Sequence, residues 1–574
     1  MYVTSVPNRR SPPAILLRES FREGGKVRNR TIANLTSWPA ARIEALRQAL
    51  RVGAKGGPRS KAFGSLEEAF DIAQTCPHGH VVAALGTLRK LGLHRMLSSK
   101  PLRARELCVA LIVQRMLDPR SKLAMSRGMD PQTLQNTLAE SLGVKEATAD
   151  ELYEAMDWLL ERQPAIEGAL AKRHLAEGSM VLYDLTSVHF EGRSCPLARL
   201  GYSRDGYRGR LQVEFGVITN ADGCPVAVDV FEGNVADPRT VASQVAKLRE
   251  QFGLKHVIFV GDRGMITSAR IREDLKPNGL DWITALRGPA IKKLVESGAL
   301  QLSLFDERDL AEIRSPDYPG ERLVVCRNPL LAAERTRKRE DLLQATEREL
   351  EKIVAATTRP LRPQRGQQAI TTRVARVINR FKMEKHFLFT ITDDSFRYER
   401  NQTSIVTEAA VDGIYVLRTS VPTERLGAVE TVQSYKRLAH VERAFRSLKT
   451  VDLKVRPIYH RKEERVRAHI FLCMLAYYVE WHMRRALAPM LFDDDDRPSG
   501  EALRTSPVAP ARRSPKALSK AATKRTEDGA PVQSFQGLLS HLASIARNRI
   551  VARAVQGAVF DKITRPNPVQ GWVA

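Results

Sequence analysis

An acidic residue inside an apolar, strand-forming run constrains this chain more than any other feature. Residues 181–192 read VLYDLTSVHFEG, and Asp184 stands in the middle of the run. Aspartate is depleted in strands, and burying an unpaired carboxylate in a sheet costs several kcal/mol. The sequence therefore predicts a strand whose carboxylate has a partner that compensates for its burial.

The charge of the chain indicates what kind of partner it binds. Its 574 residues include 91 Lys and Arg against 65 Asp and Glu, a net charge of +26. Such an excess points to a polyanion, nucleic acid first and an anionic membrane second. The longest apolar run, residues 470–479, is about half the ~20 residues that a membrane-spanning helix needs. The N-terminal residues also lack a secretory signal, so we expect a cytoplasmic protein with no membrane partner.

The cysteines favour a reducing compartment over a disulfide framework. Six cysteines are scattered along the chain without a repeating pair. The one local cluster, CPHGH at residues 76–80, could be part of a metal site. Structural zinc needs four ligands, and no second Cys/His pair follows at the spacing of a zinc finger. A zinc site at residues 76–80 is therefore disfavoured, and it stays open as an alternative.

The first 175 residues divide into a basic module and a helical region. Residues 1–60 hold 12 Lys and Arg against 3 Asp and Glu and end in a probable Gly- and Lys-rich linker. Residues 61–175, from SLEEAFDIAQ onward, carry apolar residues at spacings of three and four, which predicts helices. This region either binds DNA or serves as a helical packing domain.

From residue 176 the pattern changes to strands. VLYDLTSVHFEG and RLQVEFGVITNADGCPVAVDVFEGN predict three antiparallel strands, and Asp237 with Pro238 predicts the start of a crossover helix. HVIFVGD and DWITALRG then predict further strands. This order is that of a ribonuclease H-like α/β fold with a mixed sheet, formed by residues 176–288 and 413–488.

Residues 289–412 interrupt this order and predict a long insertion domain. Its charged segment at 329–358 predicts a solvated helix, with a coiled coil as the less favoured alternative because the heptads are short. Beyond the core, residues 489–530 are rich in Pro, Ala, Ser and Lys, which predicts a disordered tail. Residues 531–574 regain the pattern of a short C-terminal helical segment.

Two further carboxylates can meet Asp184. Asp262 ends the apolar strand VIFVG, where an isolated Asp is more often a turn or cap residue. Glu442 lies on a predicted amphipathic helix at 434–450, seven residues from both Tyr435 and Lys449 and therefore on their stripe. Alone it would be a surface residue that pairs with Arg446, four residues later.

Together the three carboxylates predict a metal site at one edge of the sheet. Mg²⁺ prefers oxygen ligands, and two such ions can hold both oxygens of an in-line phosphoryl displacement. Nearby cations, Arg443, Arg446 and Lys449, could hold a nucleic-acid backbone.

At these residues the chain resembles the DDE transposases of bacterial insertion sequences. It is similar to the cut-and-paste group whose signature is Tyr, two residues, Arg, three residues, Glu, six residues, Lys. Tyr435, Glu442 and Lys449 stand at signature positions, whereas Leu438 occupies the arginine position and Arg437 precedes it. Asp184 and Asp262 resemble the two family aspartates, and GYSRDGYRGR and EGNVADPRT also look like this group.

The resemblance implies an enzyme that cleaves DNA at the ends of the element and transfers the strand into target DNA. Asp184, Asp262 and Glu442 would bind two Mg²⁺ ions, for which Mn²⁺ could substitute. The N-terminal regions would bind the terminal inverted repeats in double-stranded DNA, and two protomers would form the synaptic complex. The residues expected to contact DNA are Tyr435, Arg437, Arg443, Arg446 and Lys449. The alternatives are a nuclease without strand transfer and a DNA-binding regulator with a decayed site.

Overall fold

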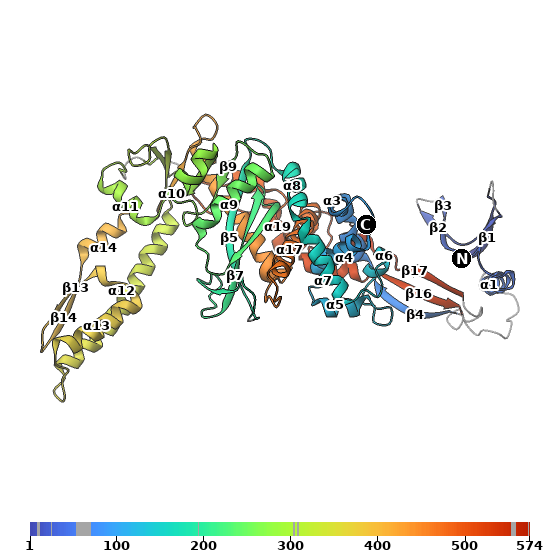
Figure 1. Cartoon of the computed structure of the whole chain (residues 1–574), viewed down its shortest axis with the longest axis horizontal. Coiled ribbons are helices and arrows are strands. Elements are labelled where there is room, and N and C mark those ends of the chain that lie inside the picture. Colours follow the sequence, from blue (N-terminus) through green and yellow to red (C-terminus); the bar gives the residue numbers. More distant parts are fainter. Residues whose placement is uncertain are drawn as a thin grey trace.

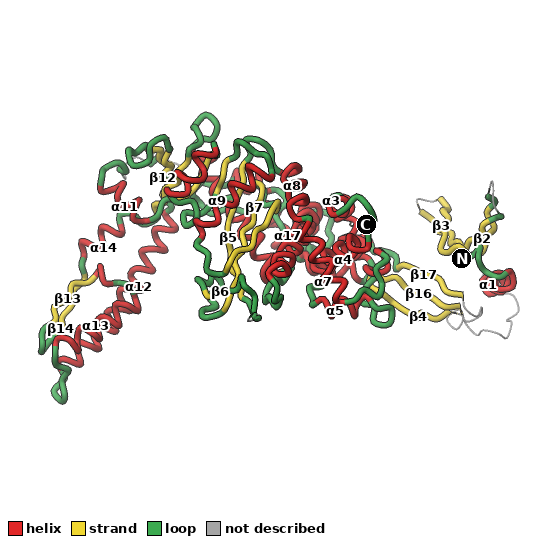
Figure 2. Tube along the Cα trace, viewed as in Figure 1, coloured by secondary structure: helices red, strands yellow, loops and turns green. Residues whose placement is uncertain are grey.

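The central feature of the computed structural model is a nine-stranded mixed sheet at the middle of an elongated molecule (Figure 1). The structure describes the whole chain except residues 9–11, 24–25, 53–69, 193, 302–304, 307–308, 553–557, 572 and 574. The described part contains a mixture of helices and strands, which confirms the predicted α/β class (Figure 2). No helix in these described ranges is both long enough and apolar enough to cross a membrane.

The sheet has the order β11-β12-β15-β10-β9-β5-β7, and β7 also pairs with β6 and β8. β7 pairs antiparallel with both β5 and β8, whereas β9 joins parallel to β5 and β10 joins parallel to β9. β5 and β7 are buried along almost their whole length, as expected for strands covered on both faces. The strands are β5 (Met180–His189), β6 (Arg199–Leu200), β7 (Leu211–Asn220), β8 (Pro225–Glu232), β9 (Ile258–Val260), β10 (Asp281–Ala285), β11 (Leu310–Ile313), β12 (Arg322–Arg327) and β15 (Ile414–Thr419).

The predicted crossover helix is present in three consecutive pieces. It begins with a 3₁₀ turn, η1 (Asp237–Thr240), and continues as α9 (Val241–Ala246) and the π-helical η2 (Lys247–Gln251). Asp237 is the first residue of the turn rather than its cap, and its side chain pairs with Arg204 instead. After β9 the chain forms three short helical pieces, α10 (Ser268–Arg270), η3 (Ile271–Leu275) and η4 (Lys276–Asn278), before β10.

A buried helix, α17 (Glu463–Leu487), packs on β8 and joins the sheet to the helical region. Its sequence AHIFLCMLAYYV is apolar all round, which fits a core helix rather than a membrane span. On its other side it contacts α2, α4 and α7. The helical region comprises α2 (Gly79–Lys90), α3 (Leu93–Leu97), α4 (Arg103–Leu117), α5 (Lys122–Met129), α6 (Leu138–Leu142), α7 (Ala149–Glu161) and α8 (Gln163–His174).

The insertion is shorter than the sequence suggested. Within residues 289–327, LAEI and RLVVCR form β11 and β12, which join the central sheet because β12 pairs with β15; helix α11 (Gly288–Glu296) precedes them. The chain leaves the sheet only at Asn328 and projects at one end of the molecule (Figure 1). The projection consists of α12 (Pro329–Thr358), α13 (Gln367–Phe381), η5 (Glu384–His386), the hairpin β13 (Phe387–Ile391) and β14 (Phe396–Arg400), and α14 (Gln402–Ala409).

The charged helix of the insertion packs within the projection. Leu343, Leu350 and Ile353 of α12 form a separate apolar core with Ile370 and Val374 of α13. The rest of α12 is largely exposed, as the prediction of a solvated helix required.

The N-terminal module is a small sheet with one helix. Its elements are β1 (Tyr2–Val6), β2 (Ala14–Glu23), β3 (Lys26–Asn34) and α1 (Ala40–Val52). The helical expectation for SLEEAFDIAQ is wrong from residue 70 on, where β4 (Phe70–Pro77) begins; residues 65–69 lie outside the described part. The partner of β4 is β16, more than 460 residues further along the chain, which no local pattern reveals.

The last 85 residues differ from the prediction. The segment expected to be disordered contains α18 (Arg497–Ala502) and α19 (Pro515–Thr523), because its acidic and basic residues neutralise one another. Lys520 is buried and donates to the carbonyls of Ala488 and Asp493 and to the Asp495 carboxylate. The C-terminal segment is helical only in part: its elements are α20 (Phe535–Ala543), β16 (Ala546–Ala552), β17 (Ala558–Ile563) and α21 (Pro568–Gly571).

Candidate active site

Asp184 lies half-buried in the middle strand of the sheet. Its carboxylate accepts a hydrogen bond from the Leu185 backbone N–H over 2.8 Å and makes no ion pair with any described residue. Burial raises the pKa of the Asp184 carboxyl to about 7, opposed by the Leu185 N–H and the charge of Arg204. The charges of Asp262 and Glu442 raise this pKa further, so both carboxylates lie close enough to act on Asp184 electrostatically.

Asp262 follows β9, the parallel neighbour of β5. The register pairs Leu182 with Val260, so two residues further on Asp262 comes level with Asp184. Asp262 is exposed, and its Oδ2 accepts from the Gly264 N–H over 3.4 Å. Its Oδ1 accepts from the Tyr435 hydroxyl over 3.3 Å, and burial together with Asp262 raises the pKa of that hydroxyl.

Glu442 lies on α16, which packs against β5. The predicted helix at 434–450 is divided at Arg437 into α15 (Ala428–Lys436), α16 (Leu438–Arg446) and the π-helical η6 (Ser447–Val451). Phe445 of α16 contacts Phe215 of β7 edge-to-face, with 5.6 Å between ring centroids. Glu442 is exposed, and no ion pair with Arg446 forms, so the expected surface pair is absent from the described residues.

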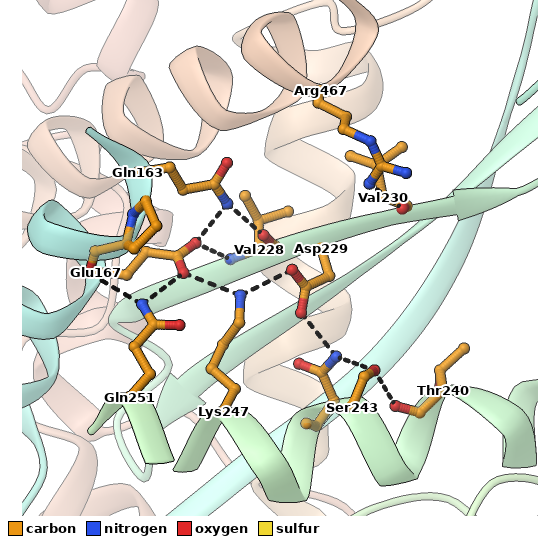
Figure 3. Close-up of polar contacts among 12 residues, drawn as sticks. Gln163, Glu167, Val228, Asp229, Val230, Thr240, Ser243, Lys247, Gln251 and Arg467 are labelled. Atoms are coloured by element: carbon orange, nitrogen blue, oxygen red, sulfur yellow. Dashed lines mark hydrogen bonds and ion pairs between the residues drawn. The ribbon is translucent and has the colours of Figure 1, made fainter. Parts of the chain in front are cut away.

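Asp184 makes no ion pair with a described residue, whereas Glu167, another buried carboxylate of this protein, does. Glu167 of α8 is almost fully buried, and Lys247 Nζ lies 2.9 Å from it and 2.7 Å from Asp229 (Figure 3). Gln163 and the Val228 N–H complete the hydrogen bonds of Glu167. Asp229 and Lys247 also line a surface hollow of about 460 Å³, which none of Asp184, Asp262 and Glu442 borders.

The three carboxylates therefore make no ion pair with a described residue, although the charge of Arg204 acts on Asp184. Their oxygens are the ligands that a hard divalent cation such as Mg²⁺ takes, and such an ion would supply the missing positive charge. They are not a compact ligand cluster: among the described residues, only His174, Cys224 and His482 bring three potential ligand atoms within 4.8 Å of one another. The donor set fits a divalent metal that keeps part of its water shell.

Arg204 and Asp237 also border this site, and residue-level reasoning on the sequence missed both. Arg204 contacts Asp237, lies 3.2 Å from Glu214, and takes its backbone position from a hydrogen bond to Ser187 of β5. A Cβ atom added to Gly264 would stand 3.7 Å from Asp237 Oδ2 and 3.5 Å from Asp262 Oδ2. Gly264 therefore separates the two carboxylates. The motif GYSRDGYRGR contains Arg204 and EGNVADPRT contains Asp237, so these two motifs were the signals in the sequence that could have indicated them.

The expected DNA-contacting residues differ in exposure. Arg437, Arg443 and Arg446 are exposed, so their guanidinium groups are free to meet a phosphate backbone. Lys449 is buried, and its Nζ donates to Asp205 over 2.9 Å. Burial lowers the pKa of Lys449, and its contact places it against the loop that carries Arg204 rather than toward solvent. Tyr435 contacts Asp262, as described above.

Acidic residues on β5, after β9 and on α16, in a strongly basic chain, are typical of metal-dependent enzymes that act on nucleic acid. The chain belongs to the DDE transposases, since the model of the family described as "Transposase DDE domain" matches residues 177–479, more than half of its length. Residues 2–62 match the family "IS1634 family transposase, N-terminal domain". The predicted DDE transposase of an insertion sequence is thereby confirmed.

Comparisons with individual proteins add little. No curated protein matches the chain. Among solved structures it is similar to a piggyBac transposase in a synaptic complex with hairpin DNA, at 8% identity and a TM-score of 0.34. That alignment covers 77% of this chain and 70% of the other. The protein is thus a DNA-cleaving transposase by its family, whose members bind DNA and generally use a divalent metal.

Proposed function

We propose that Asp184, Asp262 and Glu442 are the catalytic carboxylates and that together they hold two Mg²⁺ ions, for which Mn²⁺ substitutes. One observation carries the proposal: Asp184 of β5, Asp262 after β9 and Glu442 of α16 interact electrostatically, and none of them makes an ion pair in the described part of the chain. Burial is the main cause of the raised pKa of Asp184, and the charges of Asp262 and Glu442 add to it. When bound, Mg²⁺ would offset the charge of the reacting phosphate and favour ionisation of the attacking hydroxyl group.

The strand order supports a ribonuclease H-like core. Three antiparallel strands in the order β8-β7-β5 continue into β9 and β10, which run parallel to β5. In this arrangement the ends of β5 and β9 meet beside α16, and the site needs no residue from the insertion. This assignment rests on topology and on the position of the carboxylates.

The reaction consists of two phosphoryl transfers at this site. Water first attacks the phosphodiester at the end of the element, and the 3′ oxygen leaves and takes up a proton. The free 3′ hydroxyl then attacks a phosphodiester of target DNA, with loss of its proton and departure of the target 3′ oxygen. Neither step needs a covalent protein intermediate. Tyr435 fixes the orientation of Asp262, and Arg437, Arg443 and Arg446 neutralise phosphates along the bound strand.

The regions around the core would select and pair the DNA ends. The basic N-terminal module and the helical region are the proposed readers of the terminal inverted repeats. Because both ends of an element must be cut in concert, we infer that the active form is a homodimer. The protein would act in the bacterial cytoplasm, on the nucleoid.

The test is an assay with purified protein, Mg²⁺ and labelled DNA that carries the element's own ends, taken from the flanks of the gene. The proposal requires cleavage at the ends and joining of labelled 3′ ends to a target plasmid. Cleavage without joining would identify a nuclease instead. Binding of the ends without cleavage, in either Mg²⁺ or Mn²⁺, would identify a regulator whose site has lost its activity.

A further inference from the structure

Three potential metal ligands from distant parts of the chain meet at the β7–β8 hairpin turn. They are His174, the last residue of α8, Cys224 in the turn, and His482 of α17. Their ligand atoms all lie within 4.8 Å of one another, and Cys224 Sγ lies 3.9 Å from His482 Nε2. Two ligands of a tetrahedral zinc ion are roughly 3.3–3.8 Å apart, given the usual bond lengths. Small side-chain movements would therefore bring the three into coordination distance.

The protonation of these side chains suits metal binding. Burial lowers the pKa of His482 to about 4 and also lowers that of His174, so both imidazoles are neutral and each has a lone pair to offer. Cys224 is buried, and burial raises the pKa of its thiol, which the charges of Arg485 and Arg173 oppose. A bound metal ion would stabilise the thiolate.

The neighbouring cations are engaged elsewhere. Arg173 donates to the Leu91 carbonyl over 2.6 Å and to the Tyr478 hydroxyl over 3.2 Å. Arg485 pairs with Asp222 over 3.4 Å. The Tyr478 hydroxyl also lies 3.0 Å from His174 Nε2 and orients that ring, as second-shell groups do around metal ligands.

We propose that His174, Cys224 and His482 form a zinc site separate from the carboxylate site. One thiolate and two imidazoles are ligands that Zn²⁺ prefers, whereas the three carboxylates suit a hard ion such as Mg²⁺. The half-buried histidines leave room for water as a fourth ligand. By contrast, the CPHGH cluster forms no such group in the described residues: His78 Nδ1 lies 2.7 Å from the Thr137 hydroxyl instead.

The position of the site gives the metal a structural role. The turn that carries Cys224 also contacts α16, where the His440 ring donates to the Ala221 carbonyl over 3.1 Å. Gly223 lies in the left-handed region, and a Cβ there would stand 2.6 Å from His440 Cβ, so turn and helix are in close contact. A zinc ion would fix α8, the turn and α17 to one another. It would thereby support the surface on which α16 holds Glu442, two residues beyond His440.

The experiment is a titration of the full-length, metal-stripped protein with Co²⁺, a spectroscopic substitute for Zn²⁺. We expect a thiolate-to-cobalt charge-transfer band, together with strong visible bands of a tetrahedral ion, that saturates at one equivalent and is displaced by Zn²⁺. The Cys224→Ala and His482→Gln variants should lose the charge-transfer band. Cys326→Ala, which alters another buried cysteine, should keep it.

The Asp184→Asn variant separates the two sites, because it should retain the cobalt band whatever its effect on DNA cleavage. Zn²⁺ should also raise the Tm of the wild-type protein but not that of Cys224→Ala. The absence of a thiolate–cobalt band in the wild-type protein would overturn the proposal, and so would its persistence in either ligand variant. The wild-type titration and His482→Gln decide the matter even where Cys224→Ala does not fold.

Discussion

The hydroxyl of Tyr435 donates a hydrogen bond to Oδ1 of Asp262 over 3.3 Å, from a helix 173 residues further along the chain. This bond joins α15, which precedes the Glu442 helix, to the end of β9. The tyrosine seven residues before Glu442 thus contacts Asp262, while α16 carries Glu442.

Removing this hydroxyl should slow DNA cleavage without preventing DNA binding. A hydrogen bond to a charged group contributes about 1.5–3 kcal/mol, so Tyr435→Phe should lower the single-turnover cleavage rate by about tenfold or more. The matched control is Tyr459→Phe, which removes the hydroxyl of an exposed tyrosine. Equal rates for Tyr435→Phe and the wild-type protein would mean that the hydrogen bond does not orient Asp262.

The exposed arginines and the buried lysine of the Glu442 region should behave differently. Arg443→Ala and Arg446→Ala should each weaken binding of end DNA and reduce the slope of log K against log salt by about 1, as expected when one phosphate contact is lost. Lys449→Ala should leave this slope unchanged and lower the Tm, because Lys449 is bonded to Asp205 inside the protein. A reduced salt slope for Lys449→Ala would show instead that this lysine reaches DNA.

The buried ion pair between Lys247 and Glu167 (Figure 3) should be essential for stability. Lys247→Met leaves Glu167 buried without its cation, and breaking a buried pair in this way costs about 3–5 kcal/mol. The double variant Glu167→Gln/Lys247→Met removes both charges and should recover most of that loss. Denaturant unfolding measures both free energies, and a single variant as stable as the wild-type protein would refute the assignment.

The buried Glu480 should make stability depend on pH. Burial and the neighbouring Asp452 raise the pKa of Glu480 to about 8, although Arg484 opposes this shift. Between the ordinary value of 4.5 and about 8, the folded state holds a proton that the unfolded state has released, so stability falls as the pH rises through this window.

Replacing Glu480 with glutamine should remove this pH-dependent part of the stability, because glutamine resembles the protonated acid. The difference in Tm between pH 6 and pH 8.5 should therefore be smaller for Glu480→Gln than for the wild-type protein. Glu464→Gln alters an exposed residue of the same helix and should not change it. Parallel pH profiles for Glu480→Gln and the wild-type protein would contradict the assignment.

Local patterns carried the prediction of the core and of the acidic residues. Alternating apolar residues indicated β5, β7 and β8, and the Asp at the end of β9 could be placed because parallel strands bring their ends to the same edge. The family comparison then confirmed the class of enzyme.

What the sequence did not reveal depends on contacts between distant residues. The partner of β4 lies in the C-terminal strand β16, and the place of β12 in the sheet follows only from β15, which comes after the insertion. The burial of Lys449 depends on Asp205, 244 residues earlier, since on the helix stripe alone the lysine would be exposed. Composition also gave a wrong prediction. The run DDDDRPSG was expected to be disordered, but its Asp495 pairs with Lys520.

The most direct test of the central claim, that three carboxylates from separate elements share one metal site, is the Asp184→Asn variant. Cleavage of DNA carrying the element's ends should be measured in Mg²⁺ beside binding of the same DNA and the Tm of the protein. The account predicts loss of cleavage with end binding and folding retained. Cleavage at the wild-type rate would contradict it.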